Sequence, residues 1–217
     1  MTKEVKIIIV VAVLVLLGGA ALFIFGNPQP KESGQAVDSQ SLIRENSHMT
    51  GKRDAKVTVV EFGDFQCPGC AFAHPVVKQV IENYKDNPNF NFVFRNFPLN
   101  SIHPNAQVSS EAAEAAGEQG KYWEMHSRLY ETQTEWSENG DPKAIFVGFA
   151  RELGLDTEKF ESALNQGLYR EIVKTDLADG EAAGVTSTPT FFVNGVKQTN
   201  IPNFEEFKQL IDTELAK

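Results

Sequence analysis

Hydrophobic residues form one long uncharged block near the start of the chain. Residues 7–25 read IIIVVAVLVLLGGAALFIF. A helix of this length, at about 1.5 Å per residue, roughly matches the ~30 Å hydrocarbon core of a bilayer. The block is longer than the apolar part of a typical signal peptide, and Phe23–Asn27 make a poor cleavage site. The pattern favours an uncleaved transmembrane anchor over a removed signal peptide.

The residues on either side of this block predict its orientation. Lys3, Lys6 and the amino terminus come before it, which favours residues 1–6 in the cytoplasm and the rest of the chain outside. Residues 26–40 are rich in Pro, Gly, Gln and Ser. Such a stretch buries too little apolar surface to offset its ordering entropy. We therefore predict a flexible linker over 26–40 and one globular domain over 41–217.

The pattern within residues 41–217 alternates between strand and helix signals. β-branched or alternating apolar runs predict strands at 57–62, 90–94 and 190–193, and Asn194-Gly195 predicts a hairpin turn. Apolar positions at helical spacing predict helices after residue 67, throughout about 105–183, and near 204–215. This order predicts an α/β domain with a helical subdomain inserted at about 105–183.

Charge narrows the function classes. The formal net charge is −9, so no basic stripe is available for nucleic acid, and there is no reason to expect attraction to an anionic lipid surface. The glutamates at 111, 114 and 118 recur at helical spacing. Their spacing predicts a solvated helix face.

The candidate chemistry lies in the chain's only two cysteines, Cys67 and Cys70. Cys67 is placed where the helix begins, so unpaired N–H groups and the positive end of the helix dipole face its sulfur. Both effects lower the pKa of a thiol. Pro68 suits the first helical position, because its missing N–H costs nothing there. Cys70, one turn further in, is expected to be less exposed and to resolve a mixed disulfide formed at Cys67.

Two other interpretations of the cysteine pair remain open. A structural zinc site needs about four ligands, and the four histidines are scattered along the chain, so we predict no metal. An inert structural disulfide across so short a loop would remove little entropy from the unfolded chain. Redox chemistry is therefore the favoured interpretation.

Five segments of the chain form a recognisable set. They are residues 61–70 (EFGDFQCPGC), 97–99 (FPL), 103–106 (HPNA), 116–126 (AGEQGKYWEMH) and 184–195 (GVTSTPTFFVNG). Together they resemble DsbA-like proteins of the thioredoxin superfamily, in the family's order and over roughly Leu42 to the end of the chain. The resemblance implies a thioredoxin-like fold with a helical insertion.

The resemblance also assigns roles to residues outside the cysteine pair. Glu61 would be a buried acid with a raised pKa that relays the proton of the deeper thiol. Pro189 would be a cis-proline that shapes the substrate groove, and Thr188 would offer its backbone to a bound peptide. Pro68 and Gly69 complete the predicted substrate-binding residues.

Other polar and proline positions carry weaker expectations. Pro75 matches the family's proline that kinks the active-site helix. His74 is expected to be a partly exposed neighbour of the dithiol. His103 and His126 are expected to be structural groups with satisfied hydrogen bonds.

The resemblance implies thiol–disulfide exchange with exported proteins, without a cofactor. It also implies a membrane redox partner linked to quinone, and the predicted anchor would raise the effective concentration near it. We rank oxidase first, reductase second and isomerase third, and expect a mild oxidant because Pro68 and Gly69 carry no side-chain donor. A non-catalytic thioredoxin-fold protein that binds peptides or a metal is the alternative from another class.

Overall fold

The computed structural model describes residues 36–217. The predicted segments 1–6 and 7–25, and most of the predicted linker 26–40, lie outside the described residues. No helix within residues 36–217 is long and apolar enough to cross a membrane.

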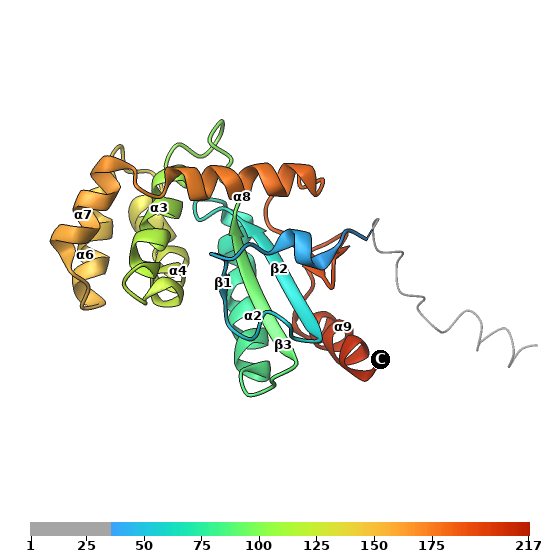
Figure 1. The fold of residues 1–217 in the computed structure, drawn as a ribbon. Helices are drawn as coiled ribbons and strands as arrows, with labels where there is room; N and C mark the ends of the chain where they lie inside the picture. Colours follow the sequence, from blue (N-terminus) through green and yellow to red (C-terminus); the bar gives the residue numbers. More distant parts are fainter. Residues whose placement is uncertain (1–35) are drawn as a thin grey trace, which may run out of the picture. The chain divides into compact units, whose positions relative to one another are not determined.

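The described residues form a five-stranded mixed sheet in the order β1-β3-β2-β4-β5 (Figure 1). The central pair, β2 (Val57–Gly63) and β3 (Phe90–Asn96), is parallel, and every residue in both strands is buried. Such continuous buried runs are typical of strands covered on both faces. The strands β1 (His48–Met49), β4 (Thr190–Val193) and β5 (Val196–Lys197) pair antiparallel with their neighbours.

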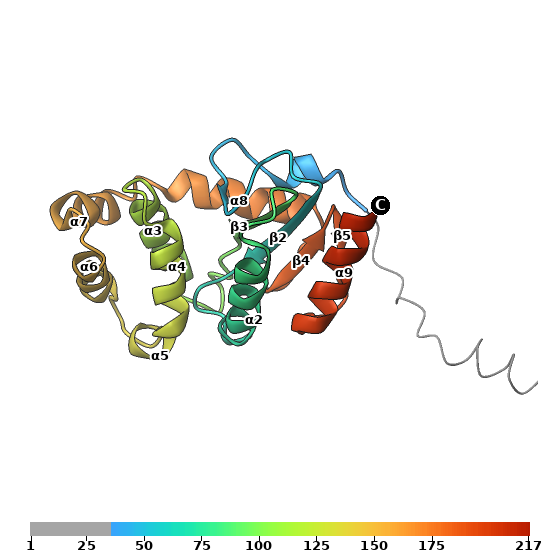
Figure 2. The same cartoon turned by 90° about the horizontal axis from the view of Figure 1, so that it is seen from below.

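Helices cover both faces of the sheet. α2 (Pro68–Tyr84) and α9 (Phe204–Ala216) lie on one face, and α8 (Arg170–Ala182) lies on the other (Figure 2). The short 3₁₀ helix η1 (Ser39–Leu42) adds apolar side chains to the α8 side. Alternate residues of β2 therefore enter different cores, with Val59 on the α2 side and Phe62 on the α8 side.

The stretch predicted to be helical lies between β3 and β4 and contains helices α3 to α8. Besides α8 they are α3 (Ala106–Gly117), α4 (Tyr122–Glu131), α5 (Gln133–Trp136), α6 (Lys143–Glu152) and α7 (Thr157–Gln166). The predicted turn at Asn194-Gly195 is present, with φ of 47° and 79°. These angles suit the tight hairpin that joins β4 and β5.

A buried arginine ties the inserted helices to the sheet. Arg95 on β3 is 0% exposed, and its guanidinium donates hydrogen bonds to Asp176 (2.8 Å) and Asp179 (2.5 Å) on α8. Arg44 also donates to Asp179. The pKa of Asp179 is lowered by its hydrogen bonds to Arg44 and Arg95, against the opposing effect of burial. This network holds α8 against the sheet on the side opposite α2.

The prediction of a solvated acidic face on α3 is wrong for two of its three glutamates. Glu111 and Glu114 are 3% and 5% exposed, while Glu118 is exposed. Glu114 accepts a hydrogen bond from Asn96 Nδ2 (2.8 Å) and lies 2.8 Å from His48 Nε2. α3 contacts α4, α6, α7 and α8, so most of its surface faces protein and not solvent.

Candidate active site

The dithiol lies where β2 passes into α2. Cys67 is the N-cap residue of α2, with Pro68 at its first position, and both cysteines are free thiols. Cys67 is 8% exposed and Cys70 is 0% exposed. The exposed Pro68 and half-buried Gly69 lie between them. Cys67 is thus the sulfur that an incoming thiol or disulfide can reach, as the sequence predicts.

The surroundings of Cys67 stabilise its thiolate. Its pKa is lowered from 9.0 to about 5, chiefly because the Cys70 thiol donates a hydrogen bond to it. Burial opposes this shift, while the Thr188 side chain and the backbone amides of Cys70 and Gly69 add to it. These groups take the place of the side-chain donor that Pro68 and Gly69 lack. Cys67 is therefore largely a thiolate at neutral pH.

The pKa values of Cys70 and Glu61 are raised, in the opposite direction to that of Cys67. Burial raises the pKa of Cys70 well above that of an ordinary thiol, and the charges of Cys67 and Glu61 raise it further. Glu61 is 2% exposed, so the acid expected to be buried is buried. Burial raises the pKa of Glu61 from 4.5 to about 8, with a smaller effect from Cys67. At neutral pH Glu61 is thus a buried and mostly protonated carboxyl group whose pKa lies about one unit above the pH.

The residues predicted to bind substrate lie together beside Cys67. The Thr188–Pro189 peptide bond is cis, as the resemblance predicts. The carbonyl oxygen of Thr188 lies 3.4 Å from Cys67 Sγ and accepts a hydrogen bond from it when Cys67 is a protonated thiol. A Cβ at Gly69 would lie 3.5 Å from Pro189 Cδ and 3.6 Å from Cys67 Sγ. The loop before β4 and the start of α2 therefore meet at the reactive sulfur.

A buried aspartate organises the loop that leads into the dithiol. Asp64 is 0% exposed and accepts hydrogen bonds from the amides of Gln66 (2.8 Å) and Leu99 (2.9 Å). Its other close partner is His103 Nδ1 at 2.7 Å, which agrees with the structural role predicted for that histidine. The amide of Asp64 itself lies 3.5 Å from Cys70 Sγ. Asp64 lies within the motif at residues 61–70, but no local pattern in the sequence marks it for this role.

The inserted helices also support this loop. Gln133 on α5 donates hydrogen bonds to the carbonyl oxygens of Phe65 (2.7 Å) and Cys67 (3.1 Å). Gln66 donates to the carbonyl of Ser137 (2.7 Å) and accepts from the amide of Asn105 (2.6 Å). The helical subdomain therefore holds the backbone on either side of the first cysteine. Nothing in the sequence marked Gln133 for this role.

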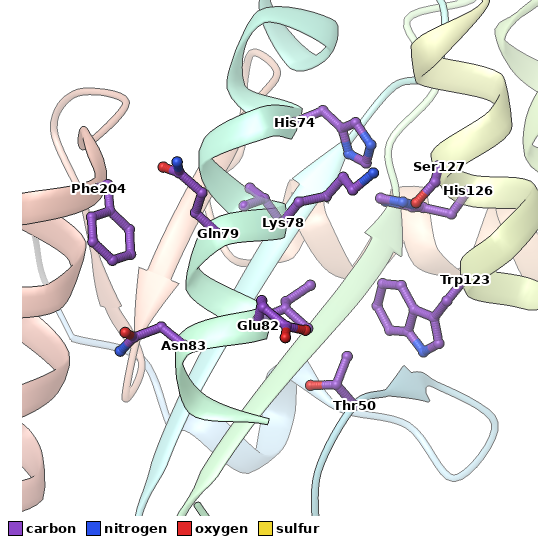
Figure 3. A pocket seen from close by; sticks show the side chains of 12 residues that line it. Thr50, His74, Lys78, Gln79, Glu82, Asn83, Trp123, His126, Ser127 and Phe204 are labelled. Atoms are coloured by element: carbon purple, nitrogen blue, oxygen red, sulfur yellow. The ribbon is translucent and has the colours of Figure 1, made fainter. Parts of the chain in front are cut away.

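His74 differs from its prediction. It is 5% exposed, not partly exposed, because α4 packs against this part of α2. His74 and His126 point toward one another from α2 and α4 (Figure 3), with ring centroids 5.3 Å apart. Burial lowers the pKa of His74 to about 4 and that of His126 well below its usual range. Nε2 of His126 has no hydrogen-bond partner among residues 36–217, so the prediction of a satisfied group is wrong.

Both histidines line an open groove of about 640 Å³ between α2 and α4. Its walls include Val77, Ile81 and Trp123, and Phe204 of α9 lies at its far side (Figure 3). The groove begins one helical turn beyond Cys70 and runs along α2 away from the dithiol. Within residues 36–217, no cluster of three or more His, Cys, Asp or Glu side chains could hold a metal ion.

A dithiol at the start of the helix after the central strand, facing a cis-proline, defines a thioredoxin-fold domain suited to dithiol–disulfide chemistry. A protein-family model described as Thioredoxin matches residues 44–213. The chain belongs to this family.

Solved structures with this fold include DsbA-like proteins. BdbD from Bacillus subtilis, in its oxidised form, is 24% identical with a TM-score of 0.72, over 85% of this chain and 98% of that one. A thioredoxin-like oxidoreductase from Silicibacter pomeroyi is 25% identical with a TM-score of 0.67, over 84% and 99%. Alpha-DsbA1 from Wolbachia pipientis is 20% identical with a TM-score of 0.72, over 82% and 96%.

Curated relatives match over a segment only. A protein named Na(+)/H(+) antiporter NhaA 1 from Salinispora arenicola is 38% identical over 172 residues, which is 79% of this chain and 25% of the relative. One named NhaA from Herminiimonas arsenicoxydans is 34% identical over 151 residues, 70% of this chain and 23% of the relative. The chain thus spans about a quarter of the length of these relatives.

Proposed function

We propose that the protein is an extracytoplasmic thiol–disulfide oxidoreductase that oxidises the thiols of exported proteins through Cys67 and Cys70. The observation that carries this proposal is the opposite shift of the two thiol pKa values, with Cys67 lowered to about 5 and Cys70 raised. Cys67 is thereby a thiolate that can react with substrate, whereas Cys70 stays protonated until a mixed disulfide has formed at Cys67.

The reaction begins with the disulfide form. A substrate thiolate attacks Sγ of Cys67, the Cys67–Cys70 bond breaks, and a mixed disulfide forms at Cys67. Cys70 leaves as a thiolate and takes a proton from Glu61, which is mostly protonated at neutral pH because its pKa is about 8. A second substrate thiolate then attacks the substrate sulfur of the mixed disulfide and releases Cys67 as a thiolate. Two electrons have passed from substrate to enzyme.

The low pKa of Cys67 favours the oxidising direction. At pH 7 an ordinary thiol with a pKa of 9.0 is protonated. A thiol with a pKa of about 5 is deprotonated, because pH 7 lies about two units above that pKa. This stabilises the dithiol form by about 2.7 kcal/mol, or about 60 mV for a two-electron couple. A stabilised dithiol makes the disulfide a stronger oxidant.

Exposed apolar residues beside the dithiol support protein substrates. Phe72 is 80% exposed and lies one helical turn after the exposed Pro68. Pro68 follows Cys67 directly in the chain, and cis-Pro189 lies beside Gly69, so apolar surface adjoins the reactive sulfur. An unfolded chain offers apolar side chains next to its cysteines, which a small thiol such as glutathione does not.

The proposed location and the proposed redox partner rest on the sequence pattern before residue 36. The apolar block at 7–25 and the preceding lysines support an anchored protein with its dithiol outside the cytoplasm. Reoxidation then requires an electron acceptor at the membrane, and we propose a quinone-linked membrane partner. Tethering would raise the effective concentration of the dithiol near that partner.

The deciding experiment is the reduction potential of the Cys67–Cys70 couple, equilibrated against glutathione. A value between about −120 and −200 mV supports the oxidase, whereas a value near about −270 mV would indicate a reductase. Two variants test the mechanism itself. Cys67→Ser is expected to abolish exchange, and Cys70→Ser is expected to accumulate mixed disulfides with substrate. Full activity of Cys67→Ser would refute the proposal.

A further inference from the structure

Tyr130 carries a buried hydroxyl group without a hydrogen-bond partner among residues 36–217. The residue lies in the last turn of α4 and is 5% exposed. Its ring packs on Phe65, in the loop leading into the dithiol, with ring centroids 4.9 Å apart. Burying a hydroxyl without a partner costs free energy that a phenylalanine would avoid. The Tyr130 hydroxyl is therefore available to donate a hydrogen bond to a group that becomes charged beside it.

The Tyr130 hydroxyl approaches the end of β2. A Cβ at Gly63 would lie 3.0 Å from Tyr130 Oη and closer still to the Phe94 ring, so glycine leaves room for both rings at this position. Glu61 and Gly63 are two residues apart on one strand, so both face the same side of the sheet. The next residue, Asp64, places its amide 3.5 Å from Cys70 Sγ. The phenol is therefore adjacent to the strand end that joins Glu61 to Cys70.

The charge pattern around Tyr130 suits a donor to an anion. Burial raises the pKa of Tyr130 well above its ordinary value, and negative charge on Cys70 and Glu61 raises it further. The hydroxyl therefore keeps its proton over the working pH range. Cys70 and Glu61 are both desolvated, so an anion on either one lacks water to stabilise it.

We propose that Tyr130 is a positioning residue for the proton transfer between Cys70 and Glu61, and the proposal rests on the function proposed above. When Cys70 resolves a mixed disulfide, its thiol proton moves to the Glu61 carboxylate. The thiolate attacks Sγ of Cys67, the Cys67–Cys70 bond forms, and the substrate sulfur leaves as a thiolate. The Tyr130 hydroxyl donates a hydrogen bond to the anion during this transfer. In the oxidase reaction the proton moves in the opposite direction, and the Tyr130 hydroxyl forms the same hydrogen bond to the anion.

The groups that face this cluster come from three parts of the fold. They are Cys67, Cys70 and His74 on α2, Glu61 and Asp64 on β2 and the loop after it, and Tyr122 and His126 on α4. Burial lowers the pKa values of both histidines, so they are neutral above pH 6. A pH profile above pH 6 therefore reports the cysteines and carboxyl groups and not the imidazoles.

The test compares Tyr130→Phe with Tyr122→Phe in the full-length protein. Tyr122 is a matched control because it lies on the same helix, is 4% exposed, and also has a hydroxyl without a partner among residues 36–217. Glu114 and Asp176 raise the pKa of Tyr122 more than Glu61 does, whereas Cys70 comes first among the charged groups that raise the pKa of Tyr130. The mixed disulfide of Cys67 with glutathione is prepared, and glutathione release by Cys70 is followed by rapid quench from pH 6 to 10. Alkylation of Cys67 is measured in parallel.

For Tyr130→Phe we expect release about tenfold slower at pH 7, with a midpoint about one pH unit higher. Alkylation of Cys67 is expected to be unchanged, and Tyr122→Phe should match the wild type. Release within twofold of the wild type would overturn the proposal. Equal slowing in both variants, or slower alkylation of Cys67, would also overturn it, because either would indicate a general packing role. Failure of the proposed function would instead appear in the wild type, as absence of exchange with a protein thiol.

Discussion

Glu61 is a carboxyl group that folding places in an apolar strand, and replacing it with glutamine should stabilise the protein. In the sheet Glu61 lies between Phe94 of β3 and Phe191 of β4. Its pKa rises from 4.5 to about 8, mainly through burial. Between pH 4.5 and about pH 8 the folded protein keeps a proton on Glu61 that the unfolded chain releases. The free energy of unfolding therefore has its full value below pH 4.5 and falls as the pH rises through about 8.

The size of the effect follows from the same two values. At pH 7 the unfolded side chain is about 2.5 pH units above its pKa, and each unit corresponds to about 1.36 kcal/mol. The carboxyl group therefore lowers the free energy of unfolding of the reduced protein by about 3 kcal/mol. Glutamine keeps the shape of the side chain and does not titrate. We expect Glu61→Gln to be about 2–3 kcal/mol more stable at pH 7 and nearly equal to the wild type at pH 4.

The assay is urea unfolding of the reduced protein from pH 4 to pH 9, followed by circular dichroism. Glu114→Gln is the matched control, because Glu114 is also buried but has Asn96 and His48 as partners at 2.8 Å. That variant should lose stability at pH 7, since it weakens contacts that the carboxylate makes. A stability gain for Glu61→Gln that is the same at pH 4 and pH 7 would refute the reasoning, as would a loss at pH 7.

Three further predictions follow. Alkylation of Cys67 by iodoacetamide should reach half its maximal rate near pH 5, as its thiolate pKa requires, and a midpoint near pH 9 would contradict the thiolate assignment. Phe72→Ala should raise KM for a reduced, unfolded protein several-fold and leave exchange with glutathione unchanged, because only a protein substrate has apolar side chains to pack on the exposed ring. Equal effects on both substrates would contradict the substrate assignment. Arg95→Leu should lower the free energy of unfolding by about 3–5 kcal/mol in denaturant titrations, since it leaves Asp176 and Asp179 without their buried partner. A loss under about 1 kcal/mol would show that Arg95 is not what holds α8 to the sheet.

The proposed chemistry places the inserted helices inside the active site, although the cysteines belong to the sheet domain. Gln133 of α5 holds the backbone at Phe65 and Cys67, and Tyr130 of α4 brings a hydroxyl to the end of β2. A change in how these helices pack would therefore alter the position of the dithiol loop. The insertion is thus expected to affect thiol reactivity as well as substrate contact.

Local sequence determined the elements and the reactive pair. Strand residues at 57–62, the turn at Asn194-Gly195 and the start of α2 at the cysteines all follow from short-range rules of backbone geometry and side-chain spacing. The position of Cys67 at a helix start also predicted the direction of its pKa shift, although the backbone N–H groups of its own helix contribute less to that shift than the Cys70 thiol does. The family resemblance added the cis peptide bond at Pro189.

Only the tertiary structure decided the environment of groups whose partners lie far away in the chain. Glu114 and His74 have the same local patterns as surface residues, yet helices from elsewhere bury them. Asp64 and Gln133 gained their roles through partners that no spacing rule connects to them. The raised pKa of Glu61 likewise depends on how completely strands and helices exclude water around it. Burial depends on how the whole chain folds, and it determines the desolvation free energy of each polar group. The local sequence determines only which polar groups are present.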